Sequence, residues 1–205
     1  MAACQRCYDG HVTDPASPAI PRELRTVFLD RDGILNEKMP EGQYVTCRED
    51  FHLLSGVADA VGRLNRAGLR VIVVSNQRGI ARGLYTLADV EAIHAAFQQQ
   101  LAGAGARIDA FFICPHDKDE CNCRKPLPGL FEQAVAQFPA ITAATSVMIG
   151  DSLSDMEFGH RLGMATIFVD VDPQRRSPYA EEAANLAELR YASLPDAVDA
   201  LLAVR

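Results

Sequence analysis

The stretch that decides the fold is VFLDRDGILN, residues 27–36. It begins as a short apolar run, which predicts a buried strand over residues 25–30 with Asp30 and Asp32 at its end. Gly33 then allows a sharp turn of the backbone. Ligands of open α/β sheets bind beyond the carboxyl ends of the strands, so the two carboxylates are expected in a site rather than in the core. Carboxylates this close repel each other unless a cation or a shared proton separates them, which favours a hard metal such as Mg²⁺.

Four more apolar runs predict strands, and helical patterns alternate with them. The strands are expected at 69–74, 108–113, 146–149 and 165–169, and the helices at 57–66, 86–102, 128–138, 153–162 and 194–204. This alternation predicts a three-layer α/β sandwich with a mostly parallel, Rossmann-like sheet. The loop 33–55 is long for its kind and is expected to lie over the site, without a large cap domain. The stretch 171–188 is polar, and no element is predicted there.

Length and composition indicate one globular domain. The chain has 205 residues, of which 48% are hydrophobic, and a formal net charge of −7. We expect residues 1–24 to form an N-terminal extension, with only a weak metal or redox signal from Cys4 and Cys7, and residues 25–205 to form the domain. The chain has no basic patch, no run of 18 apolar residues and no secretory signal, so it predicts a cytoplasmic protein that binds neither nucleic acid nor membrane.

Polar side chains stand at four predicted strand ends. They are Asp30 with Asp32, Ser75 with Asn76, Arg124 with Lys125, and Asp151. A three-layer fold would gather them at one edge of the sheet, where their chemistry suits phosphoryl transfer. One carboxylate could attack phosphorus and a second could move the proton, while serine, lysine and main-chain N–H groups hold the phosphoryl oxygens.

The loop between residues 114 and 123 predicts a second metal site. Cys114, His116, Cys121 and Cys123 supply three thiols and one imidazole within ten residues, a set that can close a tetrahedral Zn²⁺ site. Because these four donors complete the tetrahedron and no fifth donor is needed, we expect the zinc to be structural rather than catalytic. It would stiffen the loop directly before Arg124 and Lys125. The alternative is a cluster of free thiols that binds nothing.

Four ordered motifs resemble those of the haloacid dehalogenase superfamily of phosphatases. They are DRDG at 30–33, Ser75-Asn76, Lys125, and GDSLSD at 150–155, and the resemblance covers about residues 25–170. It implies that Asp30 is the nucleophile and Asp32 the general acid and base. It also implies that Mg²⁺ is held by Asp30, the main-chain carbonyl of Asp32, and Asp151.

The same resemblance assigns the residues around the phosphoryl group. It implies that Ser75 and Asn76 bind phosphate, that Lys125 neutralises it, and that Asp155 orients Lys125. Asp155 would also suit the first turn of a helix without any such role.

The pattern Cys-x-His…Cys-x-Cys-Arg-Lys-Pro narrows the resemblance to the heptose 1,7-bisphosphate phosphatases and the related histidinol-phosphate phosphatases. The segment NQRGIARG at 76–83, with Asn36, is similar to the heptose branch, in which Arg124 would help to hold the substrate and Arg82 could contact it. This implies a Mg²⁺-dependent phosphatase of small phosphorylated metabolites, a monomer or small homo-oligomer, that serves heptose supply for lipopolysaccharide.

Three departures from the family pattern keep alternatives open. Ser152 stands where a basic residue is usual, Ile34 where threonine is frequent, and only four residues separate His116 from Cys121, as in the histidinol-phosphate branch. Histidinol-phosphate phosphatase therefore remains an alternative. A non-catalytic, zinc-stabilised protein that binds a phosphorylated ligand is the alternative of another class.

Overall fold

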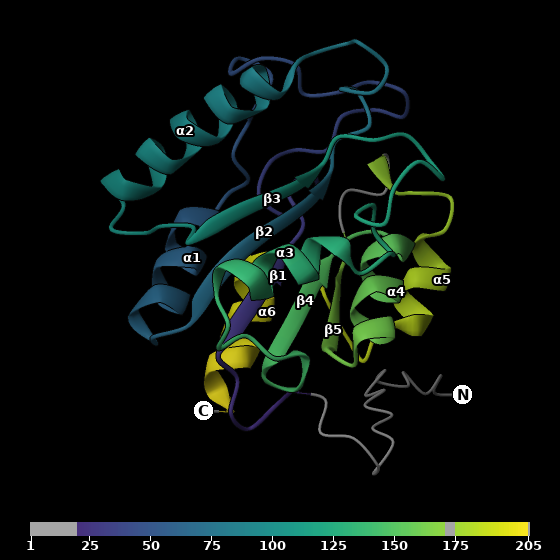
Figure 1. Ribbon diagram of the computed structural model, residues 1–205. Coiled ribbons are helices and arrows are strands. Elements are labelled where there is room, and N and C mark those ends of the chain that lie inside the picture. The colour runs from purple at the N-terminus through teal and green to yellow at the C-terminus, as the bar shows by residue number, and fades with distance from the viewer. Residues whose placement is uncertain (1–19, 171–174, 205) are drawn as a thin grey trace, which may run out of the picture.

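The computed structural model describes residues 20–170 and 175–204, so Cys4 and Cys7 lie outside the described residues. Within these ranges the centre of the molecule is a six-stranded parallel sheet with the strand order β3-β2-β1-β4-β5-β6 (Figure 1). The strands are β1 Thr26–Leu29, β2 Arg70–Asn76, β3 Ala110–Cys114, β4 Ser146–Gly150, β5 Ala165–Val169 and β6 Leu189–Tyr191. The predicted three-layer α/β fold is confirmed.

Helices cover both faces of this sheet. They are α1 Val57–Arg66, α2 Leu87–Gly103, α3 Gly129–Gln137, α4 Leu153–Leu162, α5 Ala180–Leu186 and α6 Leu194–Ala203, with a 3₁₀ turn at Ala143–Thr145. Apolar residues of α1, α2 and α6 pack on one face, and those of α3 and α4 on the other. The helix α5 packs against α4 at the outer side.

The alternation of side chains along β1 explains why both faces are apolar. Val27 and Leu29 point into the core shared with α1, α2 and α6, whereas Phe28 points into the core shared with α3 and α4. All three are completely buried. A central parallel strand is covered on both sides, so it reads as a continuous apolar run in the sequence.

The part of the chain after β5 differs from expectation. The polar stretch between residues 171 and 188 carries α5, and β6 follows it as an edge strand. The helix buries only small side chains, Ala180 and Ala183, so no apolar period announces it. The strand has three residues, which is too short for an alternating pattern. Tertiary packing, rather than local pattern, determines both elements.

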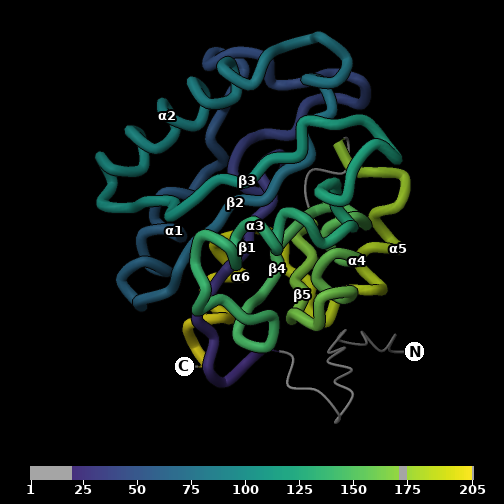
Figure 2. The backbone as a smooth tube through the Cα atoms, in the orientation of Figure 1, coloured from purple at the N-terminus to yellow at the C-terminus, as the bar shows by residue number. Residues whose placement is uncertain are grey.

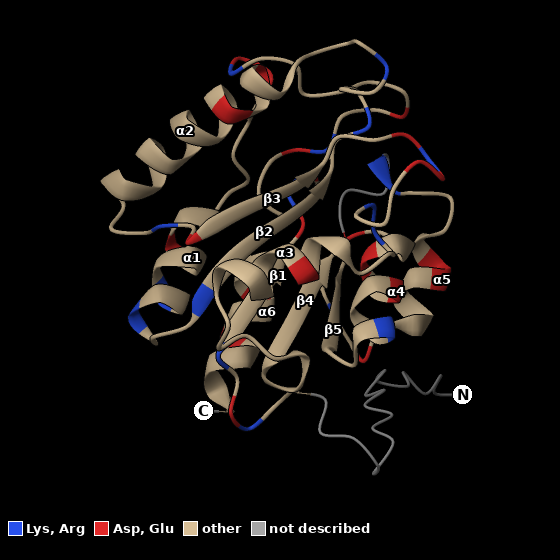
Figure 3. Ribbon diagram, in the orientation of Figure 1, with Lys and Arg blue, Asp and Glu red and all other residues tan. Residues whose placement is uncertain are grey.

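The loops at the carboxyl ends of the strands form one edge of the molecule. The long segment 30–56 and the loop between β2 and α2 run beside each other there (Figure 2), and a hydrogen bond joins Arg82 to Tyr44 across them. Charged residues of both signs follow β2 and β3 at this edge (Figure 3). In the described ranges, no helix has the length and apolar character needed to cross a membrane.

Candidate active site

Asp30 and Asp151 lie at the ends of β1 and β4, the neighbouring strands between which the strand order reverses. The strands β1 and β4 are parallel neighbours, and the Asp30 N–H donates to the Ile149 carbonyl at 3.0 Å. Asp30 therefore follows β1 beside Asp151, which follows β4. Gly33 completes this corner with φ of +94°, and a Cβ there would lie 2.6 Å from Oδ2 of Asp151. Only glycine gives both the backbone conformation and the space.

Lys125 is the buried cation of the site. Its Nζ lies 2.9 Å from Oδ1 of Asp30 and 2.6 Å from Oδ1 of Asp155, and it donates to the Val74 carbonyl at 2.7 Å. Its side chain is 1% exposed. Although burial lowers the pKa of Lys125, Asp155 and Asp30 raise it above its usual value, so the group is a fixed ammonium.

Asp155 contacts both Lys125 and the start of α4. Its Oδ1 pairs with Lys125, and its Oδ2 accepts hydrogen bonds from the N–H (3.1 Å) and hydroxyl (2.5 Å) of Ser152. Ser152 and Asp155 thus form the capping box at the start of α4. A Cβ on Gly150 would lie 2.4 Å from Asp155, so this glycine makes room for the carboxylate.

The Asp32 carboxylate accepts hydrogen bonds from three side chains. It accepts from Arg31 at 3.0–3.2 Å, from Asn36 at 3.0 Å and from Gln77 at 3.1 Å. Burial raises the pKa of Asp32, but the Arg31 guanidinium and the hydrogen bonds from Asn36 and Gln77 outweigh it and hold this pKa below its usual value. The side chain remains 28% exposed at the floor of a pocket.

Ser75 and Asn76 end β2 beside Lys125. The amide of Asn76 donates to the Lys125 carbonyl at 3.1 Å and accepts from the Lys125 N–H at 2.9 Å, so it ties the end of β2 to the segment that carries the lysine. The Ser75 hydroxyl accepts from Gln77 at 2.8 Å, and Tyr85 donates to the other end of the Gln77 amide at 2.8 Å. Gln77 therefore links Ser75 to Asp32, a role that its place in a polar loop did not suggest.

Three carboxylates gather at this point, and because both oxygens of Asp155 already contact Lys125 and Ser152, Asp30 and Asp151 are the candidate metal ligands. Oxygen atoms of Asp30, Asp151 and Asp155 lie within 4.8 Å of one another, and Oδ1 of Asp151 is buried without a hydrogen-bond partner among the described residues. Burial and the Asp155 carboxylate raise the pKa of Asp30 to about 7, and burial raises that of Asp151 to about 6. Crowded acidic groups of this kind fit a divalent cation with oxygen ligands.

The loop after β3 brings together the four predicted zinc ligands. The sulfur of Cys121 lies 3.5 Å from that of Cys114 and 3.4 Å from that of Cys123. Nδ1 of His116 lies 3.8 Å from the Cys114 sulfur and 3.3 Å from the Cys123 sulfur. Two sulfurs each about 2.3 Å from one tetrahedral zinc stand roughly 3.8 Å apart. The donor set therefore fits a small tetrahedral metal ion.

Two pockets flank the Asn76 side chain. One, of about 230 Å³, lies over Asp32 and is lined by residues 38–45, which places the long loop against the site as expected. The other, of about 400 Å³, is lined by Arg124 and Lys125. NH1 of Arg124 is buried without a hydrogen-bond partner in the described chain. Arg82 lines neither of these pockets, but it donates to Tyr44 of the first pocket at 3.2 Å, and 41% of its side chain is exposed.

Two more residues near the site are His94 and Lys38. His94 of α2 stacks on Phe111 at a centroid distance of 4.2 Å and is 7% exposed, so it is a core residue. Lys38 was not predicted. Its Nζ lies 2.6 Å from Oδ2 of Asp151, across 113 positions of sequence. Nothing local distinguishes it from a solvated lysine in a loop.

Known proteins resemble this chain in sequence. The family profile described as HAD-hydrolase-like matches residues 122–197. A D-glycero-alpha-D-manno-heptose-1,7-bisphosphate 7-phosphatase of Mycobacterium tuberculosis is 41% identical over 140 residues, which are 68% of this chain and 73% of that protein. A D-glycero-beta-D-manno-heptose-1,7-bisphosphate 7-phosphatase of Escherichia coli is 34% identical over 185 residues, 86% of this chain and 95% of that protein.

A solved structure extends the match to three dimensions. The D,D-heptose 1,7-bisphosphate phosphatase of B. bronchiseptica, complexed with magnesium and phosphate, aligns with a TM-score of 0.80 and 31% identity, covering 89% of this chain and 100% of that one. These identities extend over most of the relatives' lengths. The chain therefore belongs to the heptose-1,7-bisphosphate 7-phosphatase family of HAD-like hydrolases.

Proposed function

We propose that this protein is a Mg²⁺-dependent phosphatase that hydrolyses D-glycero-D-manno-heptose 1,7-bisphosphate to the monophosphate. The observation that carries the proposal is the contact of Lys125 with both Asp30 and Asp155 beside Asp151. It places a nucleophilic carboxylate, a fixed ammonium and a cation site around one point. The names of the relatives support the choice of a heptose bisphosphate.

The reaction proceeds in two steps on Asp30. Asp30 attacks phosphorus and forms an aspartyl phosphate while Asp32 gives a proton to the departing sugar oxygen. Asp32 then takes a proton from water, which attacks the phosphorus and restores Asp30. The hydrogen bonds that lower the pKa of Asp32 favour the carboxylate that this second step needs. Mg²⁺, held by Asp30, the Asp32 carbonyl and Asp151, would supply positive charge to the phosphoryl oxygens.

Lys125, Ser75 and Asn76 hold the phosphoryl group during both steps. Lys125 is fixed by two carboxylates and one carbonyl, so it supplies charge without reorganisation. The Asn76 amide keeps one hydrogen beyond its two bonds to Lys125. Arg124, with its free NH1, and Arg82, which contacts Tyr44 of the neighbouring pocket, suit the second phosphate of the substrate.

A structural Zn²⁺ belongs to this proposal. The donors Cys114, His116, Cys121 and Cys123 match the ligand types and separations of a closed tetrahedral site. Bound zinc would hold the loop that leads into Arg124 and Lys125. We propose a cytoplasmic enzyme that serves heptose supply. Its state as a monomer or small homo-oligomer stays a prediction.

The decisive test is phosphate release from the alpha and beta anomers of heptose 1,7-bisphosphate, with and without Mg²⁺, beside histidinol phosphate. We expect Mg²⁺-dependent release of one phosphate from the heptose. The alpha anomer is expected to be preferred, because the alpha-named relative has the higher identity over the aligned residues. Release from histidinol phosphate alone would support the related branch instead. Binding without any release would favour the non-catalytic alternative.

Asp30→Asn tests the nucleophile. Without a carboxylate that can form the acyl phosphate, we expect kcat to fall by at least about 10⁴-fold, of the order seen when a catalytic nucleophile is removed. The amide has the same shape and removes one charge from a crowded site, so the thermal unfolding temperature should not fall. Normal turnover in this variant would contradict the assignment.

A further inference from the structure

Lys38 places a second ammonium group at the carboxylate cluster, in contact with Asp151. Its Nζ contacts Oδ2 of Asp151 at 2.6 Å; the Asp151 side chain is 1% exposed, whereas that of Lys38 is 25% exposed. At this distance the two groups form an ion pair, and the lysine reaches the buried carboxylate from the solvent side.

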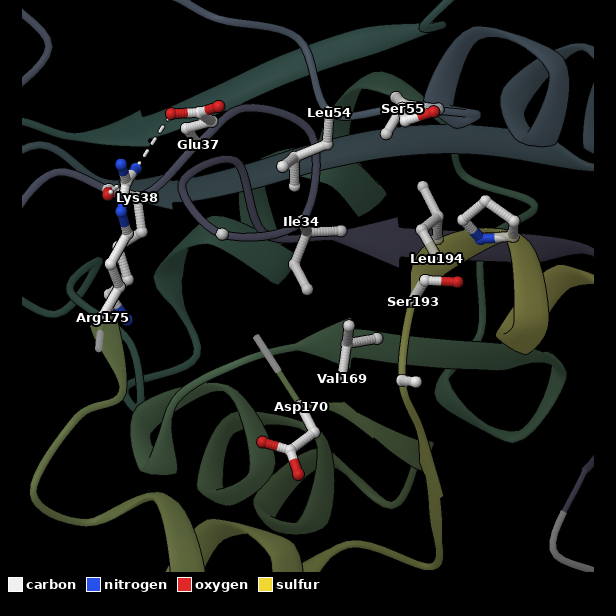
Figure 4. A pocket seen from close by; sticks show the side chains of 14 residues that line it. Ile34, Glu37, Lys38, Leu54, Ser55, Val169, Asp170, Arg175, Ser193 and Leu194 are labelled. Atoms are coloured by element: carbon white, nitrogen blue, oxygen red, sulfur yellow. Dashed lines mark hydrogen bonds and ion pairs between the residues drawn. The ribbon is translucent and has the colours of Figure 1, made fainter. Parts of the chain in front are cut away.

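The main chain of Lys38 is held in place from outside the site. NH1 of Arg175 donates to the Lys38 carbonyl at 2.8 Å and pairs with Glu37 at 3.0 Å. These three residues gather at one end of a pocket of about 340 Å³ (Figure 4). Lys38 also lines the smaller pocket over Asp32. With its backbone anchored between two pockets, the side chain can turn from one to the other.

A metal ion and Lys38 make competing demands on Asp151. Among the described residues, Lys38 is the cation that contacts the Asp151 carboxylate. The residue after Asp151, Ser152, is uncharged and caps α4. A divalent cation bound to Asp151 would stand beside an ammonium group, and like charges repel. The side chain of Lys38 would then leave Asp151. The pocket over Asp32 and Asn76, where the phosphoryl group is expected, is adjacent.

We propose that Lys38 is an exchangeable counter-ion, which neutralises Asp151 in the metal-free site and binds the phosphoryl group once a divalent cation occupies Asp151. This rests on the proposed role of Asp151 as a metal ligand. It predicts effects of opposite sign on two ligands, since Lys38 competes with the metal and assists the anion. A residue with a merely structural role would weaken the binding of both.

The test measures binding by calorimetry, without turnover. Mg²⁺ is titrated into the metal-free protein, and inorganic phosphate into the protein saturated with Mg²⁺. For Lys38→Met we expect a Mg²⁺ Kd about tenfold lower and a phosphate Kd about tenfold higher than in the wild type, as for loss of one partly buried charge contact. Lys38→Arg, which keeps the charge, should hold phosphate within about threefold of the wild type.

Arg161→Met is the control, because it removes one positive charge from an exposed position in the last turn of α4, away from these carboxylates and from the three pockets described above. Both of its affinities should equal those of the wild type. An unchanged or higher Mg²⁺ Kd in Lys38→Met, or an unchanged phosphate Kd, would overturn the exchange. Normal Mg²⁺ binding by Asp151→Asn, or none by the wild type, would instead overturn the proposed metal site itself.

Discussion

Gly33 shows how much one missing side chain decides in this site. Its φ of +94° is costly for other residues, and a Cβ would collide with Asp151. We expect Gly33→Ala to lose about 1–3 kcal/mol of unfolding free energy through backbone strain, and to weaken Mg²⁺ binding by displacing Asp151. Urea unfolding and calorimetry measure the two effects. Gly68→Ala is the control: its φ is +75° with no atom near the added Cβ, so it should lose stability and keep its Mg²⁺ affinity.

His94 makes the stability of the domain depend on pH. Burial, aided by Arg31, lowers the pKa of His94 to about 3, below its usual value of 6.5. The unfolded chain takes up this proton below pH 6.5 and the folded chain does not, so the unfolding free energy falls as the pH decreases. From pH 7 to 5 this residue contributes a loss of about 2 kcal/mol. His94→Leu, of similar volume, should reduce the loss by that amount in urea titrations at the two pH values.

At the level of elements, the loop between β3 and α3 carries the four candidate zinc donors and leads into Arg124 and Lys125. Cys121→Ser removes one donor of four, so we expect the zinc content, measured by mass spectrometry, to fall from one ion per chain. Loss of the rigid loop should misplace Arg124 and Lys125 and reduce kcat/KM by about 10²-fold.

Cys47→Ser serves as the control for that change, because Cys47 is exposed and lies outside the four-donor cluster. It should retain both zinc and activity. Full activity in a zinc-free Cys121→Ser protein would separate the loop from catalysis.

The strands and helices also show what the sequence can and cannot predict. Five strands and five helices follow from apolar runs, helical periods and caps such as Thr86, because each is decided within its own segment. The helix α5 was missed because it buries only alanines. Lys38 and Gln77 were missed because their roles depend on partners far along the chain, Asp151 and Asp32, that only the folded sheet brings near.

At the scale of the whole molecule, the residue at which the folded domain begins can be tested. Leu24 is 1% exposed and belongs to the main core, although the predicted boundary placed it in the extension. Removing residues 1–24 should therefore cost about 2–5 kcal/mol of unfolding free energy more than removing residues 1–19, as for loss of a buried leucine. Denaturant unfolding of the two truncated proteins gives the difference. Equal stabilities would place the start of the domain at residue 25.

The cluster of Cys114, His116, Cys121 and Cys123 also makes the enzyme sensitive to oxidants. Three of its four donors are thiols, and the sulfurs of Cys121 and Cys123 lie 3.4 Å apart. An oxidant such as hydrogen peroxide that converts these thiols to a disulfide would release a zinc ion bound by them and loosen the loop before Lys125, without touching the carboxylates of the candidate site. Oxidative stress would thus halt sugar-phosphate turnover at a distance from the chemistry, and a thiol reductant supplied with zinc would restore it.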